Sequence, residues 1–189
     1  LDTYLDAAKA SRAQNITVFE QGVDKIVAVM QADEFRATWV ANKAVYRTRM
    51  AMAGGGELLV IAPGVKRFGE QPEVDDLIRK YGYISKSEVL ELYAHEEDMQ
   101  EIPHGTAHLV HGSSEGRFTI RYAPGGLTKE EIESVGYEYM DVNEALERYN
   151  PEVLNDGWNT LPDGEKVYFI STPSAGLWAT RAKLEERDV

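Results

Sequence analysis

Hydrophobic and polar positions along the chain follow two different periods. Short, almost wholly apolar runs at 25–30 (KIVAVM) and 57–62 (ELLVIA) are typical of strands that are covered on both faces. Between them, apolar residues recur at roughly helical spacing from 33 to 52, with Asp33 as the expected N-cap and the glycines at 54–56 as the expected helix stop. The pattern therefore predicts a central unit of strand, helix and strand.

The rest of the chain continues this alternation. Further strands are predicted at 118–122, 137–140 and 166–171, and helices at 2–14, 71–81, 85–93, 103–114, 128–135 and 143–149. The strand at 166–171 is expected to be the last, and the charged segment 179–189 is expected to fray. Regular alternation of strands and helices predicts a mostly parallel α/β sheet with helices on both faces, in three layers and one domain spanning 1–189.

Composition narrows the classes of function. The 189 residues carry a formal net charge of −12, which argues against non-specific binding of nucleic acid or of an anionic membrane surface. Basic clusters in so acidic a chain favour small anionic ligands. The chain has no cysteine, which excludes thiolate nucleophiles and disulfides. No apolar run approaches the roughly 20 residues of a membrane span, and no signal-like segment opens the chain, so we expect a cytoplasmic protein.

A basic loop containing Lys66 and Arg67 follows the strand at 57–62. In open α/β sheets, ligands bind beyond the carboxyl ends of the strands. We therefore expect this loop to lie near a cleft.

All four histidines lie between His95 and His111. His104, His108 and His111 have the spacing i, i+4, i+7, so on one helix they share a face. Three imidazoles on one face could bind zinc or nickel, act as acid and base, or simply form a polar helix face. Since no pattern such as His-Glu-x-x-His accompanies them, we predict no dedicated metal site, and these histidines are the candidates if one exists.

Two further groups of residues are candidates for binding an anion. Lys43 and Arg47 lie one turn apart beside Asn42, and the two cations could clamp a carboxylate or be solvated. The small-residue loop at 111–117, which contains Ser113 and Ser114, could hold an anion with its backbone amides or be a plain helix-to-strand turn. Trp158 and Trp178 are expected in loops, as pocket walls or as parts of small satellite cores.

The order of these motifs resembles the C-terminal domain of the lactate racemase family. The resemblance covers about 24–146 and is carried by Trp39-Val-Ala-Asn-Lys43-Ala, the three glycines at 54–56, ELLVIAPG at 57–64 and the later strand–helix rhythm. Within the family, the segments 56–70, 107–118 and 156–161 are similar to a branch of sugar-acid epimerases that act on mannonate-like substrates.

The resemblance implies a reaction and a cofactor. The family inverts the hydroxyl-bearing carbon of a 2-hydroxy acid by transferring hydride to a nickel-pincer nucleotide and returning it to the other face. Its two acid–base histidines and the lysine that tethers the cofactor lie in an N-terminal domain, whose motifs are absent here. The chain would therefore be a C-terminal half, inactive alone, that has the N-terminal domain as its partner and closes the active-site cleft.

The resemblance also places residues of this chain. Lys43 falls where the family has a lysine near the substrate, while Val40 stands where a glutamine is expected. The strand at 25–30 also leads into Gln31-Ala32-Asp33 in place of a glycine-proline loop. Both departures fit a larger, polyhydroxylated substrate, and they fit a changed function equally well.

Two hypotheses follow. In the first, the chain covers a sugar acid such as mannonate for racemisation or epimerisation at C2, with Lys43 on the carboxylate. The expected helpers are residues that could contact the substrate: Trp39, Asn42, Arg47, His104, His108, Ser113 and Ser114. In the second, the chain is a non-catalytic module that binds sugar acids or mediates oligomerisation, with homo-oligomers as a further option for partners. Because the chain starts at Leu1, we also expect it to be a piece of something longer.

Overall fold

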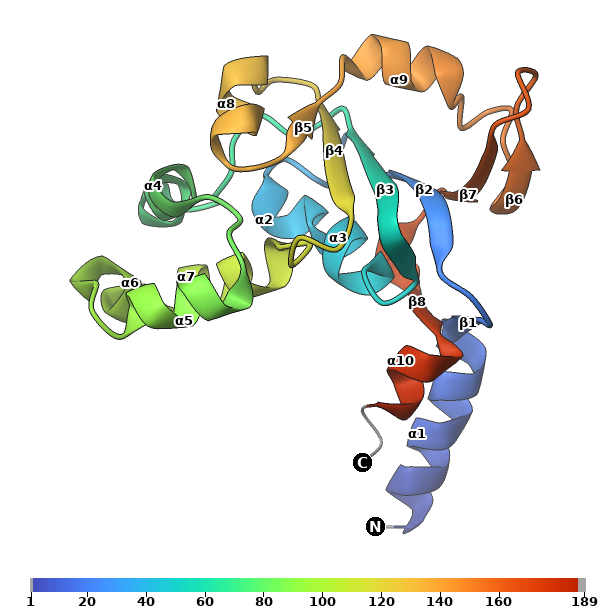
Figure 1. Ribbon diagram of the computed structural model, residues 1–189, viewed down its shortest axis with the longest axis horizontal. Coiled ribbons are helices and arrows are strands. Elements are labelled where there is room, and N and C mark those ends of the chain that lie inside the picture. The colour runs from blue at the N-terminus through green and yellow to red at the C-terminus, as the bar shows by residue number, and fades with distance from the viewer. Residues whose placement is uncertain (1, 187–189) are drawn as a thin grey trace.

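The fold is built on a six-stranded sheet in the computed structural model, which describes residues 2–186 (Figure 1). The strand order is β5-β4-β3-β2-β7-β6; all neighbours are parallel except β6 and β7, which are antiparallel. The bounds are β2 (Val23–Val29), β3 (Met52–Ala62), β4 (Thr119–Pro124), β5 (Glu138–Tyr139), β6 (Gly157–Thr160) and β7 (Lys166–Ile170). The predicted mostly parallel α/β sheet is confirmed.

Helices cover both faces of the sheet, which explains the apolar runs in the sequence. Side chains of successive strand residues point to opposite faces, so Ile26 and Ala28 join one core while Val27 and Val29 join the other. The larger core packs under α2 (Thr38–Ala41), α3 (Lys43–Thr48), α4 (Pro72–Tyr81), α5 (Lys86–Tyr93), α6 (Glu97–Glu101), α7 (Pro103–Gly112) and α8 (Lys129–Ser134). The smaller core packs under α9 (Val142–Arg148). The three-layer prediction is therefore confirmed.

Segments near the two ends of the chain form a second, two-stranded sheet. Strand β1 (Ile16–Phe19) pairs in parallel with β8 (Leu177–Thr180). Helices α1 (Asp2–Asn15) and α10 (Arg181–Glu185) both lie below the main body in Figure 1. The expectation that 166–171 is the last strand is wrong, because β8 follows it after the short 3-10 helix η1 (Pro173–Ala175). Trp178 is buried in β8 rather than in a loop, and 181–185 are helical. Residues 187–189 of the charged tail lie outside the described residues.

The central unit differs from its prediction at both ends of the helix. Asp33 lies in a turn, and α2 begins only after Ala37, which supplies no side-chain cap. The glycines at 54–56 do not stop a helix; they belong to β3, because Gly55 N donates to Arg117 O and the strand passes close to β2. A Cβ on Gly56 would lie only 2.7 Å from Asp24 O, so close strand pairing requires glycine there.

The N-caps of the helices show where the local sequence is enough to predict the start of a helix. The capping box of Thr128 with Glu131 at the start of α8 is present as predicted, and Ser85 caps α5 in the same way. The expected cap at Asn143 is wrong, because Asp141 accepts from the backbone amides of residues 143 and 144. The predicted loop around Trp158 is instead strand β6, with the indole 61% exposed.

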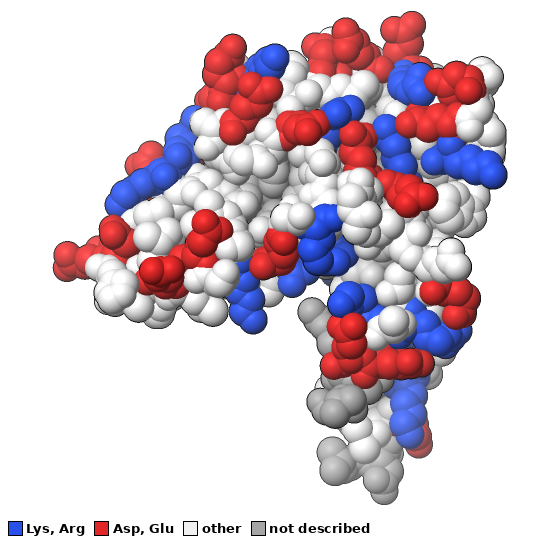
Figure 2. Space-filling view, viewed as in Figure 1, with Lys and Arg blue, Asp and Glu red and all other residues white. Residues whose placement is uncertain are grey.

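Charge is distributed unevenly over this scaffold. Figure 2 shows acidic side chains gathered over α8, α9 and the turn between β6 and β7, in keeping with the net charge of −12. None of the helices within 2–186 is both long and apolar enough to cross a membrane.

Candidate functional site

A groove runs between the outer faces of α2–α3 and α7. On α2–α3 the side toward the sheet is fully buried, which leaves Trp39, Lys43 and Tyr46 on the opposite side at spacing i, i+4, i+7. The groove has a volume of about 670 Å³ and is lined by residues of these helices: Trp39, Val40, Lys43, Tyr46, His104, Ala107, His108 and His111. The polar face of α2–α3 and the histidine face of α7 therefore line one shared pocket.

Lys43 gives the groove a cation that no carboxylate among the described residues neutralises. Three of the described lysines are half-buried, namely Lys25, Lys43 and Lys183. Lys25 and Lys183 pair with glutamates, whereas Lys43 makes no ion pair within residues 2–186 and lies with Nζ 5.4 Å from the centroid of the Phe35 ring. A partly desolvated, unpaired ammonium group is favourable for binding an anion.

Aromatic rings and imidazoles form the walls around this cation. The Trp39 ring centroid lies 4.8 Å from that of His108 and 5.9 Å from that of His104, and the Tyr46 centroid lies 6.3 Å from that of His111. The three histidines on α7 thus share a face, as their spacing predicts. Such flat rings can cover the carbon chain of a ligand while their polar edges form hydrogen bonds.

His108 is held by a buried chain of hydrogen bonds. Its Nε2 lies 3.0 Å from Tyr83 Oη, which lies 2.7 Å from Thr38 Oγ1, and Thr38 Oγ1 donates to Phe68 O at 3.0 Å. Burial, followed by the charge of His111, lowers the pKa of His108 to about 4. Burial likewise raises the pKa of Tyr83, so both groups are neutral near pH 7.

The imidazoles do not form a metal centre. Across residues 2–186, no grouping of three or more histidine, aspartate or glutamate side chains is placed to hold a metal ion. His108 Nε2 faces Tyr83, and His104 Nε2 faces Gln71 Oε1 at 3.3 Å, so the rings do not converge. The side chains present here therefore do not fit the nickel ion of the implied cofactor.

Asn42 and Arg47 lie outside the groove. Asn42 is completely buried and donates from Nδ2 to Tyr137 Oη at 2.9 Å. Arg47 extends toward the C-terminal segment and donates from Nη1 to Gly176 O at 2.9 Å. Asn42, one residue before Lys43, lies on another face of the helical segment. Arg47 lies one turn after Lys43, and its hydrogen bond to Gly176 O directs its side chain away from the groove.

The serine loop is also elsewhere. Ser113 is buried, and its Oγ accepts from the Glu115 amide at 3.0 Å, while Ser114 lines a separate pocket of about 210 Å³ beside Gly136 and Tyr137. The loop thus behaves as a helix-to-strand turn. His95 is exposed at the end of α5 and does not line the groove.

The basic loop borders one end of the groove without lining it. Lys66 and Arg67 are exposed, and Arg67 Nη2 pairs with Glu70 Oε2 at 2.5 Å. Glu70 and Gln71 line a smaller pocket of about 230 Å³, which shares Trp39 and His104 with the groove. The site therefore lies between helices rather than directly beyond the strand end.

The lining also contains Tyr46 and Ala107, which were not predicted from the sequence, and neither were the buried partners Thr38 and Tyr83. The spacing of Trp39, Lys43 and Tyr46 could have indicated the face on α2–α3. Nothing in the sequence pairs that face with α7 or brings Tyr83 under His108.

A different pocket, of about 420 Å³, lies beside α9. Glu144 and Glu147 line it, and its Arg148 is already paired with Asp163 and Glu165. This acidic lining does not suit an anion, so the groove is the better candidate.

Comparisons with known proteins agree with this fold. No protein-family model matches the sequence, and no curated protein matches it. Among solved structures, a structural-genomics protein from Thermotoga maritima matches with a TM-score of 0.68 and 21% identity, covering 94% of this chain and 42% of its own. The lactate racemase apoprotein from Thermoanaerobacterium thermosaccharolyticum matches with a TM-score of 0.62 and 10% identity, covering 93% of this chain and 40% of its own. At these identities the likeness shows the fold alone, and the chain spans about two fifths of each of the two structures.

Proposed function

We propose that this chain is the C-terminal, substrate-covering domain of a lactate-racemase-like racemase or epimerase that acts at C2 of a sugar acid such as mannonate. The observation that carries the proposal is Lys43, a half-buried cation without a carboxylate partner among the described residues, in a groove walled by Trp39 and imidazoles. The lactate-racemase-like fold supports it.

In this proposal the groove binds and orients the substrate. Lys43 holds the carboxylate, and Trp39 packs against the carbon chain, so that C2 has one fixed orientation. The imidazole edges of His104 and His111 form hydrogen bonds with hydroxyls. Because residues 2–186 offer no set of metal ligands, the proposal assigns the nickel-pincer nucleotide to the N-terminal domain.

The length of the groove favours a substrate longer than lactate. The smaller pocket shares Trp39 and His104 with it, and there Glu70 and Gln71 offer oxygen acceptors. The hydroxyls along the tail of a sugar acid are donors that match these acceptors, whereas lactate ends before them. The two pockets, which share Trp39 and His104, thus provide a cationic end for the carboxylate and an acceptor end for the hydroxyls.

The test is epimerisation at C2, which interconverts mannonate and gluconate. In a protein that carries both halves and the loaded cofactor, Lys43→Ala is expected to lower kcat/KM by at least a hundredfold, since the carboxylate loses its partner. Lys86→Ala is the matched control, because Lys86 is exposed and outside the groove. Activity of Lys43→Ala within twofold of the parent would remove Lys43 from the site and refute the proposal.

A binding module without catalysis is the second candidate. It is favoured by the fact that this chain alone forms the whole groove, without a metal ligand set in residues 2–186. Binding of mannonate that depends on Lys43, in a protein with both halves and cofactor but without turnover, would select this candidate over the enzyme.

A further inference from the structure

The hydrogen-bond chain beneath the groove determines which nitrogen of His108 carries the hydrogen. Thr38 has one hydroxyl proton and donates it to Phe68 O, so Thr38 Oγ1 accepts the proton of Tyr83. Tyr83 then has no proton left for His108, and its oxygen can only accept. Nε2 of His108 is therefore the donor in the 3.0 Å contact with Tyr83 Oη.

The opposite nitrogen of the ring is left with a free lone pair. His108 stays neutral near pH 7, because burial and the neighbouring His111 lower its pKa to about 4. Its Nδ1 makes no hydrogen bond with residues 2–186. A fully buried atom without a partner, such as Asn42 Oδ1 or Tyr122 Oη, would be shielded from solvent, and Nδ1 is not such an atom. Nδ1 is thus accessible, on a ring that lines the groove.

We propose that His108 is a specificity-determining residue whose Nδ1 accepts a hydrogen bond from the C2 hydroxyl of a 2-hydroxy acid, and so selects it over the corresponding 2-oxo acid. The proposal rests on the proposed function, because Lys43 must hold the carboxylate in the same groove. The other polar groups of the lining, which can all act as donors, are those of Trp39, Lys43, Tyr46, His104 and His111. His108 is the acceptor fixed by its surroundings.

The discrimination follows from the absence of a proton on a keto oxygen. A hydroxyl at C2 donates to Nδ1, whereas a keto oxygen would bring its lone pairs against the lone pair of the imidazole. Failure to satisfy one such group typically weakens binding about tenfold. The pair lactate and pyruvate isolates this difference, because the two share the carboxylate and the methyl group.

The first test is the tautomer of His108 in the 189-residue chain without ligand. Two-bond ¹H–¹⁵N correlation spectra at pH 7 are expected to show Nε2 protonated and Nδ1 unprotonated. A spectrum with the hydrogen on Nδ1, or with both nitrogens protonated, would overturn the proposal. This measurement does not depend on any reaction.

The second test compares the affinities for lactate and pyruvate by NMR titration. The parent chain is expected to bind lactate about tenfold more tightly, and Tyr83→Phe to reduce that ratio below threefold, because Nε2–H loses its acceptor and both tautomers become populated. Tyr122→Phe is the matched control, because Tyr122 lies in the same stack of buried tyrosines but its hydroxyl has no hydrogen-bond partner among the described residues. The tautomer spectrum of Tyr83→Phe reports the change independently of binding.

The outcomes separate the two proposals. Equal affinities for lactate and pyruvate in the parent chain, with binding that still depends on Lys43, overturn the role of His108 and leave the proposed function intact. Discrimination that survives Lys43→Ala overturns the carboxylate grip, and hence the proposed function, and supports an accepting His108.

Discussion

Lys25 and Lys43 are in similar surroundings but have different partners. Both are half-buried with the ammonium group over an aromatic ring, 5.3 Å from the Tyr149 centroid and 5.4 Å from the Phe35 centroid. Lys25 Nζ lies 2.8 Å from Glu57 and 2.9 Å from Glu165, whereas Lys43 has no carboxylate partner in the described part of the chain. Two glutamates thus neutralise Lys25, whereas Lys43 provides a cation in the groove that no carboxylate of residues 2–186 neutralises.

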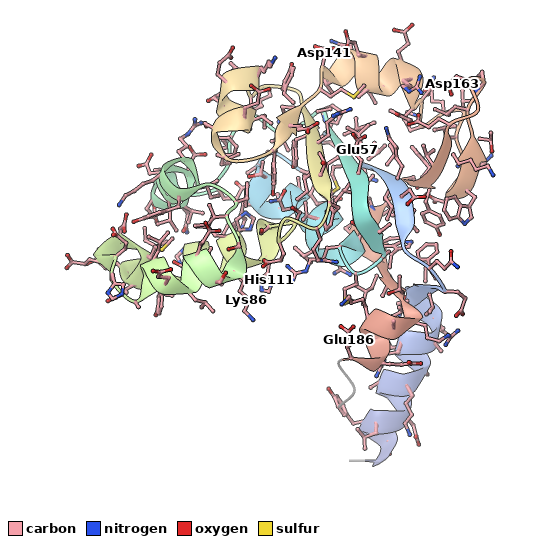
Figure 3. All side chains as sticks on the ribbon, viewed as in Figure 1. Glu57, Lys86, His111, Asp141, Asp163 and Glu186 are labelled. Atoms are coloured by element: carbon pink, nitrogen blue, oxygen red, sulfur yellow. The ribbon has the colours of Figure 1, made fainter. Side chains whose placement is uncertain are left out.

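The pKa of Lys25 shows how completely that site is satisfied. Burial alone would lower the pKa, but the interactions with Glu57, Tyr149 and Glu165 outweigh burial and raise it above its ordinary value. Arg121 and Arg148 extend the network to Glu57 and Glu165. Figure 3 shows Glu57 on the sheet and His111 on α7, so the ion-pair network and the groove occupy separate parts of the molecule.

The largest expected effect is the loss of Lys25. Lys25→Met leaves Glu57 and Glu165 without their shared cation and is expected to lower the free energy of unfolding by about 3 kcal/mol. Lys43→Met removes no ion pair and is expected to change it by less than about 0.5 kcal/mol. Urea unfolding of both variants measures the difference; equal losses would show that the two lysines are not distinct in role.

The next effect separates the groove from the network by pH. Unfolded histidine titrates near 6.5, while His108 in the folded chain titrates at about 4, so the unfolded state binds more protons between these values. Stability is therefore expected to fall by roughly 2–3 kcal/mol as the pH drops from 6.5 to 4. The pKa of Glu165 is lowered from 4.5, so the contribution of this carboxylate is lost only at lower pH.

Chemical unfolding from pH 7 to 4 checks this window. The variant His108→Gln is expected to lose the upper part of the pH dependence and keep the acid part below 4.5. An unchanged slope between pH 6.5 and 5 in the variant would show that another group is responsible.

A smaller effect is expected in the tyrosine stack beneath the groove. Tyr122→Phe removes a buried hydroxyl that has no hydrogen-bond partner within residues 2–186, and it is expected to stabilise the chain by up to about 1 kcal/mol. Tyr137→Phe removes the 2.7 Å hydrogen bond to Gly112 O and the 2.9 Å bond from Asn42, and is expected to cost about 1–2 kcal/mol. Thermal unfolding of both variants tests the sign of each change. A loss of stability in Tyr122→Phe would contradict the conclusion that the Tyr122 hydroxyl makes no hydrogen bond with the described residues.

The smallest effect is expected at the basic loop. Arg67→Ala breaks an exposed ion pair with Glu70 and is expected to change the free energy of unfolding by less than about 0.5 kcal/mol. Mannonate affinity should stay within twofold. A larger loss of affinity would move the carboxylate site from Lys43 toward the loop.

The parts of the fold that could be predicted from sequence are those that local pattern determines. The runs at 25–30 and 57–62 are apolar because both faces of β2 and β3 are buried. Strand β8 was missed because its partner is β1, at the other end of the chain, in the register Ile16 with Leu177. The glycines at 54–56 were misassigned because the pairing of β3 with its neighbours outweighs their tendency to end a helix.

The residues on each helix face of the candidate site could be predicted from the sequence, but the packing of the two faces against each other could not. Helical spacing places His104, His108 and His111 on one side of α7, and it separates Lys43 from Asn42. Spacing alone would place Arg47 beside Lys43, and the tertiary contact with Gly176 O turns it away. That α7 packs beside α3, and that Tyr83 reaches His108, are tertiary contacts with no local signal in the sequence.

Calorimetric titration of mannonate into the 189-residue chain tests the role of Lys43 most directly. We predict that Lys43→Ala weakens binding at least tenfold and that Lys86→Ala leaves it unchanged. Binding by Lys43→Ala within twofold of the parent chain would contradict the account.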